Sequence, residues 1–315
     1  MKNYAFYLIA VAIGITSLLS CGIDAPIPNN YQTKHIIVIV MDGPRFSETW
    51  GDSTHENIPF MANVLAPMGI VNTNFYNNGP TKTVSGHTAI TTGVYQEIDN
   101  GGNEIPMHAS IFQHWLADTS EENHLAWIVA SKDKLEVLNN SEDESWKNLY
   151  QPQTDCGNNG LGTGYRKDSI TYQRAINVLE THHPELLLVN FREPDSAGHS
   201  GDWEDYLQGI RDTDSYIHDL WNYIQNDPIY SESTTLFVTN DHGRHLDDVA
   251  DGFKSHGDSC EGCRHINFYA AGPDFKENII LSSSAELVDI PATIARLLHF
   301  EMPNSTGAVM FELFK

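Results

Sequence analysis

Basic residues are scarce in this sequence. The chain has 18 lysine and arginine residues against 42 aspartate and glutamate residues, a formal net charge of −24 over 315 residues. Nucleic acid is thereby excluded as a bulk partner, because such a surface would repel its backbone phosphates. A small anionic substrate is not excluded, because exposed charges are screened beyond about 8 Å at physiological salt and bound metal ions can dominate a pocket.

Long apolar runs are also lacking, apart from one near the N-terminus. Residues 7–19 form an apolar stretch after Lys2, too short for a comfortable membrane span, which predicts a signal peptide over residues 1–20. The following L-L-S-C resembles a bacterial lipobox, so we expect an acylated Cys21 and a tether over residues 21–34. The exported protein would then be anchored to a bacterial membrane, in the periplasm or at the cell surface. An ordinary secretory signal with a chance cysteine is the alternative.

Cysteine is rare as well, with three residues beyond the lipobox. Cys260 and Cys263 form a C-x-x-C motif, whereas Cys156 stands alone. An oxidising compartment favours a Cys260–Cys263 disulfide, with Cys156 as an alternative partner. Zinc binding is the weaker interpretation of the motif, because no second cysteine pair completes a tetrahedral site.

Residues 35–315 suit a single α/β domain without a second linker. Apolar runs or short strand patterns occur at 35–41, 69–75, 125–130, 186–191, 235–239 and 266–271. Helical spacing of apolar residues occurs at 58–68, 84–92, 108–118, 167–182, 203–225 and 285–300. This alternation predicts a mostly parallel central sheet with helices on both faces. The aperiodic stretch 136–166 is expected to be a surface loop or a lid over a pocket.

Carboxylate and imidazole side chains gather near the predicted strand ends. They are Asp42, Asp195, His199, Asp241, His242 and His256. Each one alone is more simply a turn, a helix cap or a surface residue. Ligands of open α/β sheets, however, bind beyond the carboxyl ends of the strands, so the joint placement predicts a metal site. The mixture of oxygen and nitrogen ligands suits Zn²⁺ or Mn²⁺ better than Ca²⁺.

Thr83 lies in the segment P-T-K-T-V-S-G-H-T, residues 80–88, where a predicted helix begins. Taken alone, a threonine in this place is best interpreted as a helix N-cap. The same place also suits a nucleophile. A helix N-terminus stabilises negative charge, and metal coordination can turn a weak hydroxyl into an alkoxide.

Together these motifs resemble the alkaline phosphatase superfamily, which includes nucleotide pyrophosphatases/phosphodiesterases, phosphonoacetate hydrolases and cofactor-independent phosphoglycerate mutases. P-T-K-T at 80–83 is similar to the nucleophile stretch of the pyrophosphatases, and E-P-D-x-x-G-H at 193–199, D-H-G at 241–243 and H-G at 256–257 resemble their metal motifs. K-D-K-L at 132–135 resembles an element of phosphonoacetate hydrolases. The tail from V-D-I-P-A-T at 288–293 to Gly307 is similar to the closing helix and strand of the family.

The resemblance implies a two-metal phosphohydrolase that cleaves phosphomonoesters or phosphodiesters through a covalent phospho-threonine at Thr83. The first ion, with zinc favoured over manganese, would be held by Asp195, His199 and His256. The second would be held by Asp42, Asp241, His242 and Thr83. His265, which also precedes a predicted strand, is the alternative to His256.

The resemblance also indicates which residues bind the phosphate oxygens of a small phosphorylated substrate. The candidates are Asn103, Lys132, Lys134, Arg244 and His245. A turn residue is the alternative for Asn103, and a surface ion pair with Asp247 or Asp248 is the alternative for Arg244. The segment after Thr83 reads T-x-x-G-H rather than the T-x-P-N-H of the pyrophosphatases, so the resemblance leaves monoester or diester preference open.

Other functions fit the sequence less well. Sulfatases of this fold require Cys or Ser two residues before a proline, and no proline of the chain meets this condition. Phosphoglycerate mutases carry a large inserted domain for which the chain is too short. A phosphonate hydrolase remains an alternative. A non-catalytic surface binding lipoprotein would predict missing metal ligands, yet every position is filled.

Overall fold

The computed structural model describes the chain except for residues 2–29. The expected signal peptide beyond Met1, the acylated Cys21 and most of the expected tether lie outside the described residues. Thr33, near the end of the expected tether, packs on the folded domain. It donates hydrogen bonds from its backbone N and its Oγ1 to Asp274, at 2.8 and 2.6 Å. The compact unit accordingly begins at Tyr31. None of the helices described is both long and apolar enough to cross a membrane.

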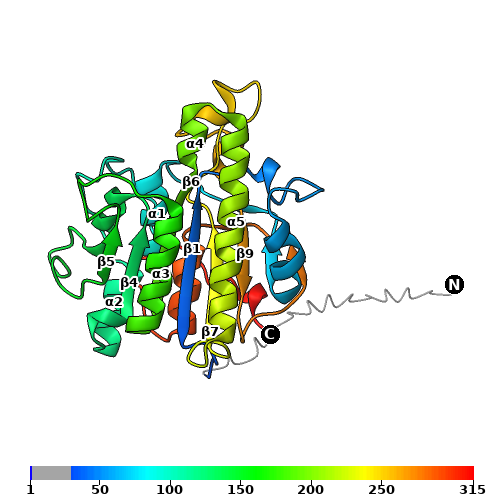
Figure 1. The fold of residues 1–315 in the computed structure, drawn as a ribbon. Coiled ribbons are helices and arrows are strands. Elements are labelled where there is room, and N and C mark those ends of the chain that lie inside the picture. The colour runs from blue at the N-terminus through cyan, green and yellow to red at the C-terminus, as the bar shows by residue number, and fades with distance from the viewer. Residues whose placement is uncertain (2–29) are drawn as a thin grey trace. The chain divides into compact units, whose positions relative to one another are not determined.

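An eight-stranded sheet forms the centre of this unit, in the order β10-β2-β9-β7-β1-β6-β4-β5 (Figure 1). Its strands are β1 (His35–Asp42), β2 (Ile70–Asn72), β4 (Ala126–Ala130), β5 (Gln153–Cys156), β6 (Leu186–Pro194), β7 (Thr234–Thr239), β9 (Phe268–Ala271) and β10 (Ile279–Leu281). Strands β4, β6, β1 and β7 are consecutive neighbours and all parallel, whereas β9 runs antiparallel to β2 and β7. The predicted mostly parallel sheet is confirmed.

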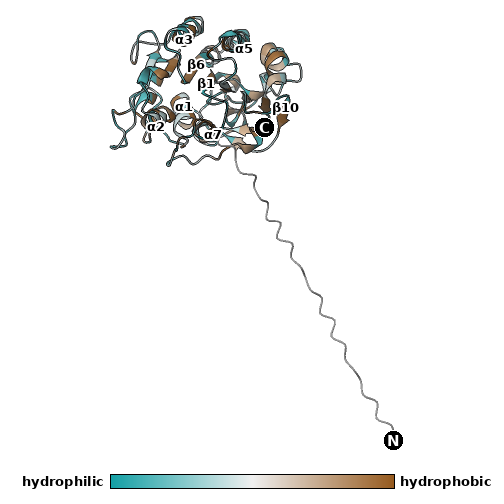
Figure 2. Ribbon diagram, turned by 90° about the horizontal axis from the view of Figure 1, so that it is seen from below, coloured by the Kyte–Doolittle hydropathy of each residue, from teal (hydrophilic) through white to brown (hydrophobic). Residues whose placement is uncertain are grey.

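A smaller sheet lies in the order β11-β3-β8, with β3 (Phe75–Tyr76), β8 (His265–Ile266) and β11 (Ala285–Glu286). The α-helices are α1 (Thr83–Thr92), α2 (Ile111–Thr119), α3 (Asp168–His182), α4 (Asp195–Ser200), α5 (Trp203–Asn226), α6 (Glu261–Arg264) and α7 (Asp289–Leu297). Short 3-10 or π turns are η1 (Phe46–Glu48), η2 (Met61–Leu65), η3 (Ala66–Met68), η4 (Asn123–Leu125), η5 (Asp133–Asn139), η6 (Gly252–Lys254) and η7 (Phe311–Leu313). Helices α3 and α5 cover one face of the large sheet, and α1, α2 and α7 cover the other (Figure 2).

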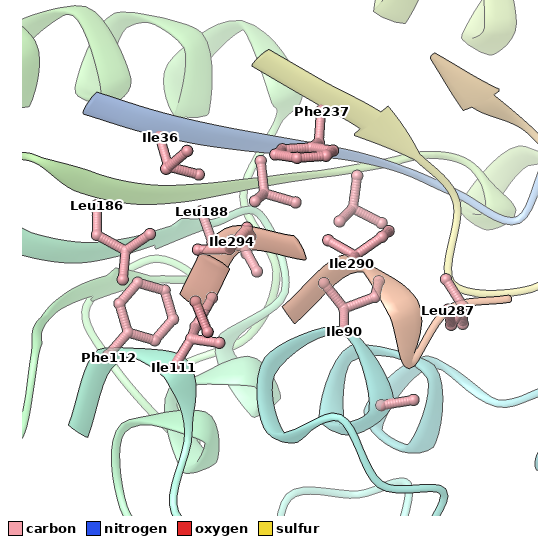
Figure 3. Close-up of a cluster of buried hydrophobic side chains, with 14 of the residues drawn as sticks. Ile36, Ile90, Ile111, Phe112, Leu186, Leu188, Phe237, Leu287, Ile290 and Ile294 are labelled. Carbon is pink, nitrogen blue, oxygen red and sulfur yellow. The ribbon is translucent and has the colours of Figure 1, made fainter. Parts of the chain in front are cut away.

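The apolar run of β1 is explained by two hydrophobic cores, one on each face of the sheet. Ile36, Val38 and Val40 point into the core that includes residues of α1, α2 and α7 (Figure 3). Ile37 and Ile39 point into the other core, with residues of α3 and α5. Because both faces are buried, the strand shows no polar alternation. Burial of each such side chain contributes roughly 1.5–3 kcal/mol to the stability of the domain.

Three local predictions differ from the structure. The helix expected over 285–300 is divided into β11 and α7, because Pro291 lacks the N–H that a longer helix would need and α7 begins only two residues before it. The stretch 136–166 is not all loop, since it continues η5 and supplies the edge strand β5. The expected closing strand near the C-terminus is reduced to one bridge between Phe275 and Phe314.

The predicted disulfide is wrong, because Cys156, Cys260 and Cys263 are all free thiols. Cys260 is the N-cap of α6, and its Sγ accepts the backbone N–H of Cys263 at 3.4 Å. Its sulfur therefore serves as a hydrogen-bond acceptor rather than as a bridge. Cys156 is buried on the edge strand β5, where its Sγ–H points to the carbonyl oxygen of Ile128 at 3.8 Å.

Candidate metal centre

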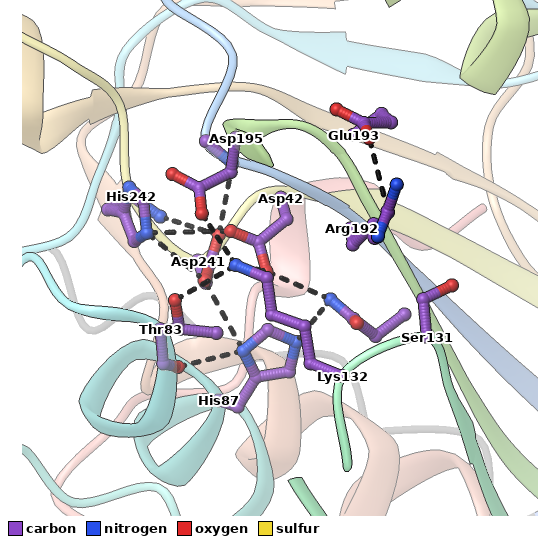
Figure 4. Close-up of polar contacts among 12 residues, drawn as sticks. Asp42, Thr83, His87, Ser131, Lys132, Arg192, Glu193, Asp195, Asp241 and His242 are labelled. Carbon is purple, nitrogen blue, oxygen red and sulfur yellow. Dashed lines mark hydrogen bonds and ion pairs between the residues drawn. The ribbon is translucent and has the colours of Figure 1, made fainter. Parts of the chain in front are cut away.

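Four neighbouring parallel strands deliver one charged residue each to the same edge of the sheet. Asp42 ends β1, Asp195 follows β6, Asp241 lies two residues after β7, and Lys132 lies two residues after β4. All four side chains are buried, with exposed fractions between 0 and 4%. Their side chains converge on one point, shown in Figure 4. Three carboxylates and one ammonium group are thus buried together in one site.

One side of this site holds Asp195, His199 and His256. The Nε2 atoms of His199 and His256 each lie 3.3 Å from Asp195 Oδ1, and 3.2 Å from one another. His199 reaches Asp195 because the two residues are one turn apart on α4, where side chains at i and i+4 are neighbours. These are the three residues that the sequence assigns to the first ion.

The other side holds Asp42, Asp241 and His242. His242 Nε2 lies 3.6 Å from Asp42 Oδ1 and 3.4 Å from Asp241 Oδ2. These three atoms are buried and have no hydrogen-bond partner among the described residues. A buried polar atom without a partner is costly, and three of them facing one another indicate a ligand that binds all three.

The histidines present the correct nitrogen atoms. His242 donates from Nδ1 to the carbonyl oxygen of Gly243 at 2.9 Å, and His256 donates from Nδ1 to that of Thr81 at 2.7 Å. The lone pair of each Nε2 is therefore free to bind a cation, in the manner of metal-binding histidines. The two rings stack with their centroids 3.7 Å apart, which connects the two sides of the site.

The spacing of these atoms fits divalent cations. Ligands at about 2.0–2.1 Å from a tetrahedral ion are about 3.3 Å apart, close to the separations found on both sides of the site. Two groups, Asp195 with His242 and His256 and Asp42 with Asp241 and His242, have ligand atoms within 4.8 Å of one another. Mixed carboxylate and imidazole ligands are those of zinc and related metals.

Thr83 is the first residue of α1, and its buried hydroxyl lies at this site. Lys82 occupies the N-cap position, so the interpretation of Thr83 as an N-cap is wrong. The Nζ atom of Lys132 lies 3.3 Å from Thr83 Oγ1, 2.6 Å from Asp195 Oδ2 and 2.9 Å from Asp42 Oδ2. One ammonium group therefore joins the hydroxyl to a carboxylate from each side of the site.

The protonation of the site follows from burial and charge. Burial and the neighbouring Asp241 raise the pKa of Asp42 to about 7. For Asp195, burial also acts to raise the pKa, but the charge of Lys132 outweighs it and holds the pKa well below its usual range. Burial opposes the charge of Lys132, yet Asp195 and Asp42 raise the pKa of its ammonium, so it stays protonated. The three carboxylates repel one another, and the single charge of Lys132 offsets this repulsion only in part. Divalent ions bound at the site would neutralise the rest.

Two residues of the T-x-x-G-H segment position the others. A Cβ atom at Gly86 would lie 2.4 Å from the carbonyl oxygen of Asp241, so only glycine lets the two segments meet. His87, which was not among the predicted site residues, donates from Nδ1 to the Thr83 carbonyl at 2.8 Å, and its Nε2 accepts from Asn190 at 3.2 Å. Asn190 in turn donates to Asp42 Oδ2 at 3.2 Å. This chain of hydrogen bonds connects α1 to a carboxylate of the second group.

Several predicted site residues lie elsewhere. His265 stacks between Phe46 and Tyr76, and its Nε2 faces the carbonyl of Thr73. The structure thus brings His256, not this alternative, to the site. Asn103 is exposed and bonded to Asp99, which agrees with the turn alternative.

Arg244 is fully buried and differs from both of its predicted roles. Its guanidinium donates to Asp195 and to the carbonyl oxygens of Phe253 and Lys254 and is shielded from solvent, so it is not open to a phosphate. Nor does it form the surface ion pair, because Asp247 is bound by Arg45 at 2.9 Å. Arg244 instead fixes Asp195 against the loop that contains η6.

His245 is turned to a different set of partners. Its ring bonds with Asp251, Ser255 and Asp258, at 3.1–3.2 Å. It is therefore not a candidate for binding phosphate at the metal centre.

Asn100 is a site residue that the sequence analysis missed. Its Oδ1 accepts the backbone N–H of Val84 at 3.0 Å and the Nζ–H of Lys134 at 3.3 Å. The amide thus lies over the N-terminus of α1, three residues from the predicted Asn103. The sequence signal was only an asparagine downstream of Thr83, which does not distinguish two asparagines in one loop.

A cleft of about 730 Å³ opens from the site to solvent. Its lining includes His199, His256 and Asn100, and its remaining charged residues are Lys82, Glu97, Asp99 and Glu104. Lys82 is ion-paired to Glu97, so the outer wall of the cleft has an excess of negative charge.

Comparisons with known proteins identify the family of the chain. The sequence model of the Metalloenzyme superfamily matches residues 82–302, more than half of the chain. A 2,3-bisphosphoglycerate-independent phosphoglycerate mutase of Haloquadratum walsbyi is 26% identical over 217 residues, which cover 66% of this chain and 39% of the mutase. The chain spans less than half of the length of the curated relatives it matches.

Solved structures share the fold. An inactive murine ectonucleotide pyrophosphatase/phosphodiesterase 5 in complex with AMP aligns with a TM-score of 0.63 at 15% identity, over 90% of this chain and 100% of that chain. A protein in the alkaline phosphatase superfamily from Vibrio parahaemolyticus aligns with a TM-score of 0.64 at 14% identity, over 90% of this chain and 71% of that chain. The predicted alkaline phosphatase-like fold is confirmed, and the chain belongs to the Metalloenzyme superfamily.

Proposed function

We propose that the protein is a two-metal phosphoester hydrolase in which Thr83 is the covalent nucleophile. One observation carries this proposal: the Thr83 hydroxyl shares the ammonium group of Lys132 with Asp42 and Asp195, one carboxylate from each group of metal-binding residues. The similar proteins support it, since a phosphoglycerate mutase and a nucleotide pyrophosphatase/phosphodiesterase both act on phosphate esters.

The residues that would hold the ions are those already grouped by geometry. Asp195, His199 and His256 would bind one, and Asp42, Asp241 and His242 would bind the other, with zinc favoured over manganese because the ligands are mixed nitrogen and oxygen. Divalent ions bound there would lower the pKa of the Thr83 hydroxyl and stabilise charge on the phosphoryl oxygens and the leaving group.

The chain's own residues would then direct the reaction. Thr83 Oγ1 gives up its proton to solvent and attacks phosphorus while the bond from phosphorus to the ester oxygen breaks, which leaves phospho-Thr83 and a leaving group that takes up a proton from solvent. Lys132 stays charged throughout and holds the attacking oxygen and the phosphoryl group together. Water then cleaves phospho-Thr83 and regenerates the hydroxyl. Such positioning and charge neutralisation are what phosphoryl transfer requires.

We further propose a preference for monoesters. Lys132 and Lys134 both lie at the nucleophile end of α1, and the Asn100 amide between Lys134 and Val84 offers an N–H₂ group. This concentration of donors suits the dianion of a monoester better than the monoanion of a diester. The acidic outer wall of the cleft favours a leaving group without negative charge, although the exposure of its carboxylates weakens this selection.

Turnover of p-nitrophenyl phosphate and of its bis-ester, together with metal analysis, tests this proposal. We expect a higher kcat/KM for the monoester and two divalent ions at the metal centre. A higher kcat/KM for the bis-ester would reassign the protein as a phosphodiesterase. Absence of turnover of both esters by metal-loaded protein would reject the hydrolase.

Phosphonate hydrolysis is a second candidate, favoured by one observation. Lys132 belongs to the K-D-K-L segment that resembles phosphonoacetate hydrolases, and its ammonium lies at Thr83 Oγ1. Release of phosphate from phosphonoacetate at a rate above that from p-nitrophenyl phosphate would favour this candidate.

Lys134 makes substrate binding depend on pH. Burial and the adjacent charge of Lys132 lower the pKa of Lys134 to about 8, so its ammonium is charged below this pH and neutral above it. If it binds a phosphate oxygen, KM rises as the pH passes about 8. The variant Lys134→Arg keeps its charge, because arginine stays protonated, so its KM should stay flat over the same range. Identical KM–pH profiles for the two proteins would contradict this role.

A further inference from the structure

A second group of metal-binding side chains lies outside the centre described above. It consists of His245, Asp258, Cys260 and Cys263, whose ligand atoms all lie within 4.8 Å of one another. Two of the four come from the C-x-x-C motif at the start of α6, and His245 comes from the loop after β7. The sequence offered no second cysteine pair, but folding brings an imidazole and a carboxylate to the two thiols.

The imidazole of His245 is oriented as a metal ligand. Its Nδ1 lies 3.2 Å from Asp251 Oδ1 and 3.1 Å from Ser255 Oγ, and its Nε2 faces Asp258 Oδ2 at 3.1 Å. A carboxylate on one ring nitrogen, with the other nitrogen directed at the ligand group, is the usual arrangement around a metal-bound histidine. The residue is 6% exposed, so this orientation is maintained by packing.

The thiols are likewise arranged around a common point. Cys260 Sγ accepts the backbone N–H of Cys263, and Cys260 donates its own N–H to Asp258 Oδ1 at 2.9 Å. Burial raises the pKa of both thiols, so the thiolates that bind metal would form only together with the positive charge of an ion. Cys263 is completely buried, Cys260 is half-buried and Asp258 is exposed, so the group lies at the surface with one open side.

We propose that His245, Asp258, Cys260 and Cys263 form a structural zinc site. Two sulfurs, one nitrogen and one oxygen make a complete set of four protein ligands, as in closed structural zinc sites. Thiolates select zinc over calcium and magnesium, which prefer oxygen ligands. A full set leaves no position for substrate, so this ion would stabilise structure rather than react.

The site would fix the loop that carries a ligand of the metal centre. His256 lies between His245 and Asp258 in the sequence. The Asp258 carbonyl accepts from Thr81 Oγ1 at 2.7 Å, and Gly243 donates its N–H to the Cys263 carbonyl at 2.8 Å. An ion bound by residues on both sides of His256 thus restricts that loop, and its loss would weaken metal binding at the catalytic centre without removing any of its ligands.

Cobalt substitution tests this proposal without depending on activity. The metal centre contains no cysteine, so a thiolate-to-cobalt charge-transfer absorption can arise only where Co²⁺ meets sulfur. We expect this absorption in reduced, full-length protein loaded with Co²⁺, and its loss in Cys260→Ser/Cys263→Ser. Zinc content by elemental analysis should fall by one ion per chain in the same variant. Cys156→Ala, which removes the remaining described thiol, should retain both signals.

A variant that leaves the fold intact guards against loss of signal through misfolding. Asp258→Asn changes an exposed side chain and should weaken Co²⁺ binding at this site by at least about tenfold, with the thermal unfolding temperature of the zinc-depleted protein unchanged. The proposal is overturned if the wild-type protein shows no charge-transfer absorption. It is also overturned if peptide mass spectrometry of protein purified without reductant finds a Cys260–Cys263 disulfide and the cysteine variants keep the full zinc content.

Discussion

Thr83→Ala is expected to lower kcat by on the order of 10⁴-fold or more, because it removes the atom that we propose attacks phosphorus. The fold should survive, since Lys82 rather than Thr83 occupies the N-cap of α1 and the Thr83 side chain supports no helix N–H. Metal content should change little, because the paired carboxylates and histidines remain. Steady-state kinetics and the intact mass of acid-quenched enzyme measure the two effects.

Thr83→Ser is the matched control for this experiment. A serine hydroxyl at the same place keeps the nucleophile, so this variant should become phosphorylated during turnover and retain a large part of the activity. Acid-quenched Thr83→Ala should carry no phosphoryl group. A phosphorylated Thr83→Ala protein, or wild-type turnover by it, would show that another residue is the nucleophile.

Asp42→Asn is expected to have the second largest effect. The substitution keeps the shape of the side chain but removes a buried carboxylate whose Oδ1 lies 3.6 Å from His242 Nε2 and has no hydrogen-bond partner among the described residues. We expect loss of about one bound metal ion and a fall in kcat/KM on the order of 10³-fold, typical of removing a principal electrostatic contribution. Elemental analysis and kinetics at saturating zinc measure both.

The control is Asp118→Asn, which removes the same charge from an exposed position on α2. This variant should keep the metal content and activity of the wild type. Full metal occupancy in Asp42→Asn would remove Asp42 from the set of ligands. Loss of metal with unchanged activity would separate the metal from the reaction and contradict the two-metal proposal.

The sequence predicts much of the site because its motifs follow strand ends. The apolar runs of β1, β6 and β7 are long enough to be recognised, and parallel strands must place their carboxyl ends at one edge. Asp42, Asp195 and Asp241 could therefore be grouped before any distance was known. His199 followed from its position four residues after Asp195, and the structure places the pair one turn apart on α4.

Side chains that occur in loops were harder to predict. His256 and His265 both precede a strand, and only packing shows that His265 is stacked between aromatic rings. Asn100 and Asn103 share one loop, and only its path places Asn100 over Val84. Such choices depend on contacts between segments far apart in the sequence, which local patterns do not contain.

The fold class, the edge of the sheet at which the site lies and the identity of most candidate metal ligands were determined by the sequence alone, since hydrophobic periodicity and residue type are local properties. The tertiary structure decided that Lys132 joins Thr83 to the carboxylates and that Arg244 holds Asp195. It also decided that His245 lies beside Asp258 and the C-x-x-C motif and not at the predicted phosphate-binding site. The physical reason is that a long side chain on a loop can reach several partners, and burial against distant segments selects one of them.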